Sequence, residues 1–227
     1  MMEQKRILCY GDSNTWGHIP GDGRRFAPEL RWTGRLAAEF AGQCVILEEG
    51  LNGRSTVFDD DCLPCRNGLK GLGYALVSQK PIDVLILSLG TNDLKHTDAA
   101  GSAKGLERLL RLCTQASVCF DSGVSPIFRD GAGILVVSPI HLHPQIALRR
   151  PESSLAKKYE ASLHFAEQLA PVAARYGAAF VDAAQYAAPS EIDCVHLDAE
   201  GHAALSAAIG RALRGLLTDG SQKGTVL

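Results

Sequence analysis

The chain has 227 residues, of which 46% are hydrophobic and 21% are charged, and its formal net charge is −2 at pH 7. This length can bury a sizeable core, and without a Pro-, Ser- or Gly-rich linker it predicts one domain over residues 1–227, with residues 219–227 as a frayed tail. The charge balance and the lack of a basic cluster argue against nucleic-acid binding. No run of about 18 apolar residues and no cleavable leader stands out, so we expect a soluble, cytoplasmic protein without a membrane segment.

The cysteines and histidines give no strong signal for a metal or a cofactor, and we expect neither. Seven cysteines are scattered along the chain, which favours reduced thiols. Cys62 and Cys65 form a lone CxxC pair that could be redox-active or half of a zinc site, but they follow the aspartates of residues 59–61 in an expected loop without a second pair. His141 and His143 have no carboxylate or Cys at ligand spacing, which favours a pocket rim or plain surface.

The first chemically informative segment lies close to the N-terminus. Residues 7–10 have the length and the apolar character of a buried parallel strand, and this run ends at Gly11, followed by Asp12, Ser13 and Asn14. Ligands bind at this end of the strands in open α/β sheets, because the strand fixes the residue while the following loop stays open. The alternative is a turn without a functional role, since all four residues favour turns.

Helical and strand-like segments alternate through the rest of the chain. Residues 118–133 are predicted to form a loop, because Pro and Gly interrupt their apolar pattern. The alternation predicts a three-layer α/β/α sandwich with a mainly parallel, five-stranded sheet. Helical spacing covers residues 32–40, 69–79, 104–120, 153–176 (with a kink or break at Pro171) and 199–217, and the later apolar runs cover residues 44–47, 84–89, 134–137 and 180–182.

Two further polar segments follow the later strands, and a third stands before the last helix. Gly53 lies in a small loop after the second strand, and Asn92 lies in one after the third. Asp193 and His196 stand three residues apart before the last helix, a spacing that can place the carboxylate against one imidazole nitrogen and leave the other free. From this spacing alone, a histidine that only hydrogen-bonds locally is the simpler interpretation.

Taken together, four separated segments resemble the signature blocks of the SGNH hydrolases, also called GDSL-type esterases. The resemblance covers residues 5–217 and implies a flavodoxin-like α/β/α fold, no cofactor and a small acyl ester as substrate. Wider strings are similar to the bacterial arylesterase/acyltransferase branch, whose members often form homo-oligomers. The four blocks are residues 11–14, 50–53, 90–93 and 193–196, and the wider strings are residues 6–17, 31–34 and 48–54.

The resemblance also implies a role for individual residues. Ser13 would be the nucleophile, His196 the general base, and Asp193 the carboxylate that orients the imidazole. The backbone N–H groups of Ser13 and Gly53 and the side-chain amide of Asn92 would form the oxyanion hole.

Other residues in or near the blocks have expected structural roles or are expected in the pocket. We expect Asp12 and Asp93 to make structural hydrogen bonds. Asn14, Trp16 and His18 are candidate pocket residues. Asn14 stands where the name-giving motif has Leu and would alter the pocket wall, and His18 falls where some relatives have Trp. For Trp16, core packing is an equally good interpretation.

Three functions remain open at this point. The leading one is a serine esterase that hydrolyses short-chain aryl, alkyl or acetylated-sugar esters. The second is an acyltransferase that passes the acyl group to an alcohol or sugar hydroxyl. The third is a non-catalytic binding domain on the same fold, which the presence of Ser13 and His196 disfavours. Acyl length and the natural alcohol depend on the loops at residues 17–28, 57–68 and 118–150.

Overall fold

The computed structural model describes residues 3–120 and 125–219. Five strands form one sheet in the order β2-β1-β3-β4-β5, and every neighbouring pair is parallel. This is the flavodoxin-like strand order, and with helices on both faces it confirms the expected α/β/α sandwich. The strands are β1 (Lys5–Gly11), β2 (Cys44–Gly50), β3 (Ile82–Ser88), β4 (Phe128–Ser138) and β5 (Ala179–Asp182).

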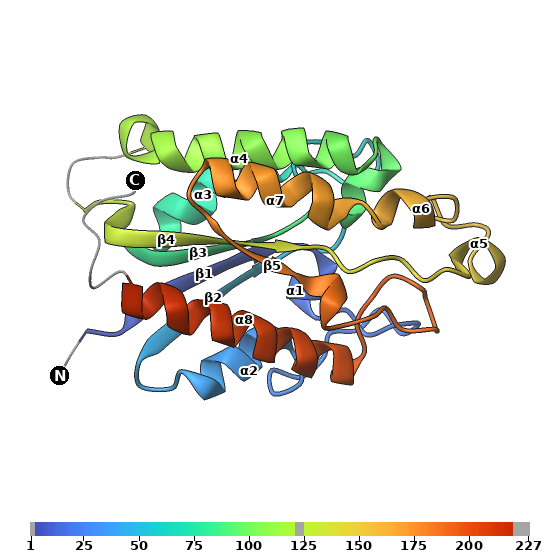
Figure 1. The fold of residues 1–227 in the computed structure, drawn as a ribbon, viewed down its shortest axis with the longest axis horizontal. Coiled ribbons are helices and arrows are strands. Elements are labelled where there is room, and N and C mark those ends of the chain that lie inside the picture. The colour runs from blue at the N-terminus through green and yellow to red at the C-terminus, as the bar shows by residue number, and fades with distance from the viewer. Residues whose placement is uncertain (1–2, 121–124, 220–227) are drawn as a thin grey trace.

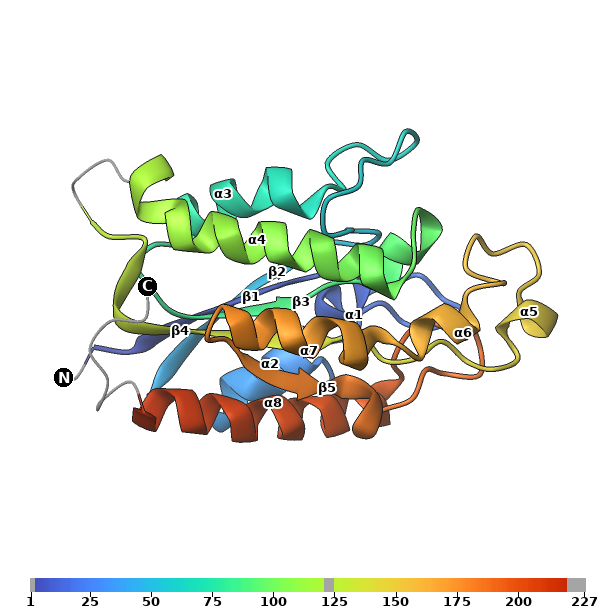
Figure 2. The same ribbon diagram turned by 45° about the horizontal axis from the view of Figure 1, so that its top comes forward.

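Helices cover both faces of the sheet, as Figure 1 and Figure 2 show from two directions. One face carries α3 (Gly68–Gln79), α4 (Ala99–Phe120) and α7 (Phe165–Arg175), and the other carries α2 (Trp32–Glu39) and α8 (Ala199–Asp219). None of the helices in the described ranges combines the length and the hydropathy that crossing a membrane requires.

The sheet divides the core into two layers, and successive residues of a strand alternate between them. In β1, Leu8 and Tyr10 join the layer of α3, α4 and α7, whereas Ile7 and Cys9 join the layer of α2 and α8. All four side chains are buried. Because helices cover both faces, the central part of each inner strand is apolar on both sides, which is why these strands contain continuous apolar runs in the sequence.

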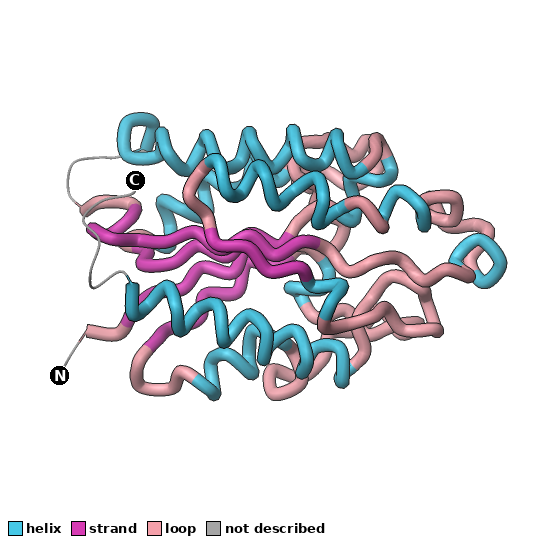
Figure 3. Tube along the Cα trace, in the orientation of Figure 1, coloured by secondary structure: helices cyan, strands magenta, loops and turns pink. Residues whose placement is uncertain are grey.

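The carboxyl ends of the strands lie at the end of the molecule opposite the start of β1, and the longer loops gather there (Figure 3). This is the edge of the sheet at which the sequence placed the polar blocks. Several short helices shape these loops: α1 (Ser13–Trp16), α5 (Ile146–Arg149), α6 (Tyr159–Ser162) and the 3-10 helices η1 (Thr91–Lys95) and η2 (Ala183–Gln185).

The fourth strand is longer than its sequence pattern predicts. It begins at Phe128, inside the segment 118–133 that was predicted to be a loop; residues 121–124 of that segment lie outside the described residues. Its pairing with β3 shifts register between Ile82 and Val84, and Gly131 takes a φ of 75°. Because of this irregularity, the first part of the strand lacks the regular apolar spacing from which a strand is predicted.

The predicted helix over residues 153–176 is also wrong in its extent. Residues 153–158 form turns, and a break at residues 163–164 separates α6 from α7. Pro171 lies inside α7, which continues to Arg175, so the helix does not break at the proline. Leu155 and Ala156 are buried in the turn segment, where tertiary packing overrides the helical spacing. Residues 220–227 of the predicted tail lie outside the described residues.

Candidate active site

The turn from β1 into α1 presents Ser13 at the edge of the sheet. Ser13 is the first residue of α1, and Asp12 caps this helix by accepting a hydrogen bond at Oδ1 from the backbone N–H of Asn14, 3.0 Å away. Glycine is required before the cap, because a Cβ on Gly11 would lie 2.0 Å from Oγ1 of Thr15. The strand and its tight turn therefore hold the serine in one place.

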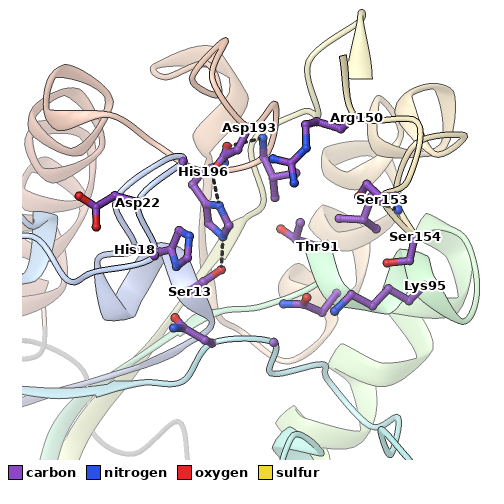
Figure 4. Close-up of a pocket in the computed structure, with 17 residues that line it drawn as sticks. Ser13, His18, Asp22, Thr91, Lys95, Arg150, Ser153, Ser154, Asp193 and His196 are labelled. Atoms are coloured by element: carbon purple, nitrogen blue, oxygen red, sulfur yellow. Dashed lines mark hydrogen bonds and ion pairs between the residues drawn. The ribbon is translucent and has the colours of Figure 1, made fainter. Parts of the chain in front are cut away.

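The segment from Asp193 to His196 brings a carboxylate and an imidazole to that serine. Asp193 Oδ1 accepts hydrogen bonds from the backbone N–H groups of Val195 and His196, at 3.1 and 2.9 Å, and its Oδ2 lies 2.7 Å from Nδ1 of His196. Nε2 of the same ring lies 2.8 Å from Oγ of Ser13 (Figure 4). The same carboxylate thus shapes the turn and orients the ring. Cys194 completes the turn in the left-handed region, with φ at 68°.

Asp193 carries its negative charge inside a largely buried site. Burial opposes that charge, but the hydrogen bond from the His196 side chain, the charge of that imidazole and the backbone N–H groups of His196 and Val195 outweigh it and hold the pKa of Asp193 at about 2. A carboxylate that stays ionised can fix the tautomer of His196 and stabilise the ring when it takes up a proton.

Two further loops bring hydrogen-bond donors to the cavity that contains Ser13. Gly53 has a φ of 79°, a left-handed conformation that favours glycine. Its Cβ would come no closer than 3.4 Å to Arg66, so the backbone conformation, and not crowding, requires glycine. Asn92 donates from Nδ2 to the carbonyl oxygen of Arg54 at 3.1 Å, which fixes its amide. Both residues line the cavity together with Ser13.

Arg54 joins these loops, and sequence reasoning missed it. Its guanidinium donates to the carbonyl oxygen of Gly11, 2.9 Å away, and to that of Glu49, so it bridges the ends of β1 and β2. Cζ lies 4.0 Å from the ring centroid of Tyr10, in a cation–π contact. Because its backbone carbonyl also receives the Asn92 amide, one buried residue fixes three of the loops at this edge.

Asp12 and Asp93 make the structural hydrogen bonds expected of them. Asp93 accepts from the backbone N–H and from the hydroxyl of Thr56, both at 2.7 Å. Burial raises the pKa of Asp12 to about 6, against the opposing effect of the Asn14 N–H. Burial likewise raises the pKa of Asp93 to about 6, in spite of its bonds to Thr56. Neither carboxylate lines the cavity at Ser13.

The cavity in front of Ser13 has a volume of about 530 Å³ (Figure 4). It receives side chains from loops that follow several different strands, as expected at this edge of the sheet. Beyond the residues already described, its lining consists of His18, Gly21, Asp22, Gly23, Asn52, Thr91, Lys95, Arg150, Ser153, Ser154, Leu155 and Val195.

Of the three predicted pocket residues, the structure brings only His18 to this cavity. Its ring centroid lies 4.0 Å from that of His196, with the two planes inclined by 31°. Asn14 instead points toward the segment after His196, where its Oδ1 accepts a hydrogen bond from the Leu197 N–H at 2.9 Å. Trp16 lies outside the cavity beneath the guanidinium of Arg25, whose Cζ is 5.5 Å from the ring centroid. Neither residue forms the wall that the motif comparison suggested.

One group of side chains has the compactness of a metal site. Ligand atoms of His18, Asp193 and His196 lie within 4.8 Å of one another. Both ring nitrogens of His196 already have hydrogen-bond partners, in Asp193 and in Ser13, so an ion bound to this ring would displace one of them. The side chains of Asp193, His196 and Ser13 are arranged for proton transfer from Ser13 to His196.

Two basic lining residues had not been predicted as part of the site. Lys95 follows Asn92 in η1, so extending the third block by one helical turn would have found it. Arg150 lies at the end of α5, in a region without a motif, and only the tertiary structure reveals its proximity.

Comparisons with known proteins identify the family. The native aryl esterase of M. smegmatis superposes with a TM-score of 0.80 at 32% identity, over 93% of this chain and 99% of that one. A carbohydrate acetylesterase family member from Sinorhizobium meliloti superposes with a TM-score of 0.83 at 33% identity, over 95% of this chain and 100% of that one. Est24, a carbohydrate acetylesterase from the same organism, superposes with a TM-score of 0.84 at 31% identity, over 94% of this chain and 100% of that one. No curated protein matches significantly.

The family match spans most of the chain, from residue 9 to residue 204, and includes all four polar blocks. The relatives of similar structure are esterases and share the arrangement of sheet and helices described above. The chain therefore belongs to the GDSL-like lipase/acylhydrolase family and is a carboxylic ester hydrolase with the SGNH hydrolase fold.

Proposed function

We propose that this esterase cleaves short-chain acyl esters through a covalent acyl-enzyme intermediate on Ser13. The observation that carries the proposal is the unbroken chain of hydrogen bonds from Asp193 through His196 to Ser13, with separations of 2.7 and 2.8 Å, at the floor of a cavity. A serine hydroxyl is a weak nucleophile at its free pKa, and an adjacent, oriented base makes it reactive.

The reaction proceeds in two halves that use the same groups. Oγ of Ser13 attacks the ester carbonyl carbon while Nε2 of His196 takes its proton, and the tetrahedral intermediate collapses as His196 gives that proton to the departing alcohol oxygen. Water then attacks the acyl-enzyme with His196 again as the base, which releases the carboxylic acid and restores Ser13. Asp193 stabilises the imidazolium in both halves.

The charge that develops on the carbonyl oxygen needs donors that are already in place. The N–H groups of Ser13 and Gly53 donate to no described residue, and the Asn92 amide retains a hydrogen beyond the one given to Arg54. These neutral, fixed donors can meet the oxyanion without reorganising.

The similar structures support two substrate classes, aryl esters and acetylated carbohydrates, because their names describe an aryl esterase and carbohydrate acetylesterases. The acyl-enzyme could also be resolved by an alcohol or sugar hydroxyl, which would make the protein an acyltransferase. Product analysis in water with added alcohol separates the two outcomes: acid alone reports hydrolysis, and a new ester reports transfer.

The covalent step is tested with 4-nitrophenyl acetate and a fluorophosphonate. We expect a burst of nitrophenol equal to the enzyme concentration and, by mass spectrometry, a label on Ser13. Ser13→Ala should show neither, whereas Ser78→Ala, on the exposed side of α3, should show both. Folded wild-type protein that is not labelled, or a burst that survives in Ser13→Ala, would contradict the proposal.

A further inference from the structure

Two basic side chains enter the cavity that contains Ser13 from different parts of the chain. Lys95 ends the 3-10 helix η1 after β3, and Arg150 follows α5 after β4. Figure 4 shows the Lys95 side chain extending toward the middle of the cavity, with Arg150 entering from a neighbouring wall. Both lie on the side of Ser13 away from His18.

The ammonium group of Lys95 makes no ion pair and no hydrogen bond within the part of the chain that the structure describes, and the carboxylates of Asp60 and Asp12 act on it only as more distant charges. Its side chain is half-buried, yet no carboxylate and no hydrogen-bond acceptor of residues 3–120 or 125–219 binds its ammonium group. Removing a charge from water without a partner is unfavourable, and a negatively charged ligand would offset that cost. The lysine is therefore available to a substrate.

Arg150 is only partly engaged. Its Nε donates to Oε1 of Glu152 at 2.6 Å, and that carboxylate is 64% exposed. Neither terminal nitrogen of the guanidinium binds an acceptor among the described residues, so its fork remains open for a second carboxylate.

The acidic residues of the cavity do not cancel these charges. Asp22 is held by Arg24 through two contacts of 2.6 Å and lies beyond His18 in Figure 4, on the opposite side from Lys95. Asp193 is committed to His196. Glu152, Asp60 and the more distant Asp193 reduce the net positive charge on that side. Glu152 and Asp60 do not line the cavity, so the charged groups that face it there are Lys95 and Arg150, with the hydroxyl groups of Ser153 and Ser154 as neutral donors nearby.

We propose that Lys95 and Arg150 form a subsite for a carboxylate carried by the ester substrate. The inference rests on the proposed function and narrows its substrate class to acyl esters whose alcohol or acyl half bears a carboxylate. Arg150 offers the planar fork that matches a carboxylate, and Lys95 offers a point charge that can approach it from a second direction. The reacting carbonyl would meanwhile lie at Ser13.

The test compares each anionic ester with a neutral isostere. One series probes the alcohol half with 4-carboxyphenyl acetate and 4-carbamoylphenyl acetate. The other probes the acyl half with mono-4-nitrophenyl adipate and the 4-nitrophenyl ester of adipic acid monoamide. For each ester, kcat/KM is divided by the rate constant of its alkaline hydrolysis, which corrects for intrinsic reactivity. The readout is the ratio of this normalised kcat/KM for the anionic ester to that for the neutral ester. We expect a wild-type ratio above one in at least one series, decreasing with added salt.

Variants then assign the preference to the two residues. Lys95→Met and Arg150→Gln should each lower the ratio by about 10-fold to 100-fold, the size expected for a charge-assisted hydrogen bond. Lys95→Arg should keep most of the wild-type ratio, because the positive charge remains. Lys104→Met, an exposed lysine of α4, is the matched control and should leave the ratio unchanged. The ratio compares two esters in the same variant, so a general loss of activity cancels.

The outcomes separate the two proposals. A wild-type ratio at or below one in both series, or a ratio that both variants leave intact, overturns the carboxylate subsite while the esterase mechanism stands. If wild-type protein hydrolyses none of the four esters and the fluorophosphonate does not label Ser13, the proposed function itself has failed.

Discussion

The Asn92 amide is held in place before any substrate arrives. It donates to the carbonyl oxygen of Arg54 at 3.1 Å, and the residue is only 8% exposed. A donor fixed in this way stabilises an oxyanion without reorganisation. We expect Asn92→Ala to lower kcat for 4-nitrophenyl acetate by about 10²-fold to 10³-fold, or about 2.7–4 kcal/mol.

This variant should still be labelled by the fluorophosphonate at Ser13, and its circular dichroism should match that of wild type. An unchanged kcat in the folded variant would contradict the proposed role of Asn92 as an oxyanion donor.

Asn14 binds the backbone that follows His196, the proposed general base. Its Oδ1 accepts from the N–H of Leu197, a fully buried residue, so the helix that begins at Ser13 and the segment that carries His196 are tied together. Asn14→Leu keeps the side-chain size but leaves that N–H unpaired. We expect the free energy of unfolding in urea to decrease by about 1–3 kcal/mol, with a lower kcat.

Asn14→Asp is the matched variant, because it keeps an acceptor oxygen at the same position. If Asn14→Leu and wild type share the same kcat and the same urea midpoint, the hydrogen bond does not position His196.

The candidate site forms where the strands β1 and β3 lie side by side in the sheet. The chain leaves β1 toward α2 on one face of the sheet and leaves β3 toward α4 on the other. Connections that diverge in this way open a crevice at the carboxyl ends of the two strands. The loop after β2 closes the crevice from the neighbouring strand and brings Gly53 into it.

Arg54 fixes the loops after β1, β2 and β3 relative to one another. Arg54→Met removes the donors to Gly11 and Glu49 but keeps a long side chain over the Tyr10 ring. We expect kcat to decrease more than KM changes, because the proposed oxyanion donors at Gly53 and Asn92 would lose their fixed positions while the cavity remains. Steady-state kinetics with 4-nitrophenyl acetate measure both constants.

Arg54→Lys restores a cationic donor and should recover part of kcat. A loss of kcat in Arg54→Met that Arg54→Lys does not relieve would indicate that the cation–π contact, and not the hydrogen bonds, is what the site requires.

At the scale of the whole molecule, buried carboxyl groups should make stability depend on pH in two opposite ways. The pKa of Asp193 is about 2, below its usual 3.8, so its contribution to stability is present above pH 3.8 and is lost as the pH falls toward 2. Burial raises the pKa of Asp12 and of Asp93 from 3.8 to about 6. Their contribution is present below pH 3.8 and is lost as the pH rises through 6.

Asp93→Asn isolates one of these groups, because an amide resembles the protonated acid. Its oxygen can still accept from the Thr56 N–H, and its nitrogen can donate to the Thr56 hydroxyl oxygen. We expect the urea midpoint of the wild type to decrease between about pH 4.5 and 7.5 by more than that of the variant. Parallel pH dependence in the two proteins would contradict a raised pKa at Asp93.

Much of the fold could be predicted from the sequence. Strands buried on both faces leave continuous apolar runs such as residues 84–89, and the helices that cover them leave spaced leucines, so the order of elements was visible. The first part of β4 and the break before α7 could not be predicted in this way. A register shift near Gly131 interrupts the regular pattern of β4, and the burial of Leu155 in a turn overrides the helical spacing before α7.

The four polar blocks could be found in the sequence because each is a short local motif, and three of them follow directly after strands whose apolar runs are visible. The contacts of other residues came only from the fold: Arg54 lies in a string that the sequence analysis named but bridges the ends of β1 and β2, Arg150 reaches the cavity from a region without a motif, and Asn14 binds Leu197 and does not line the cavity. Local hydrophobicity fixes where a strand ends, whereas the direction of a loop side chain depends on contacts with distant segments.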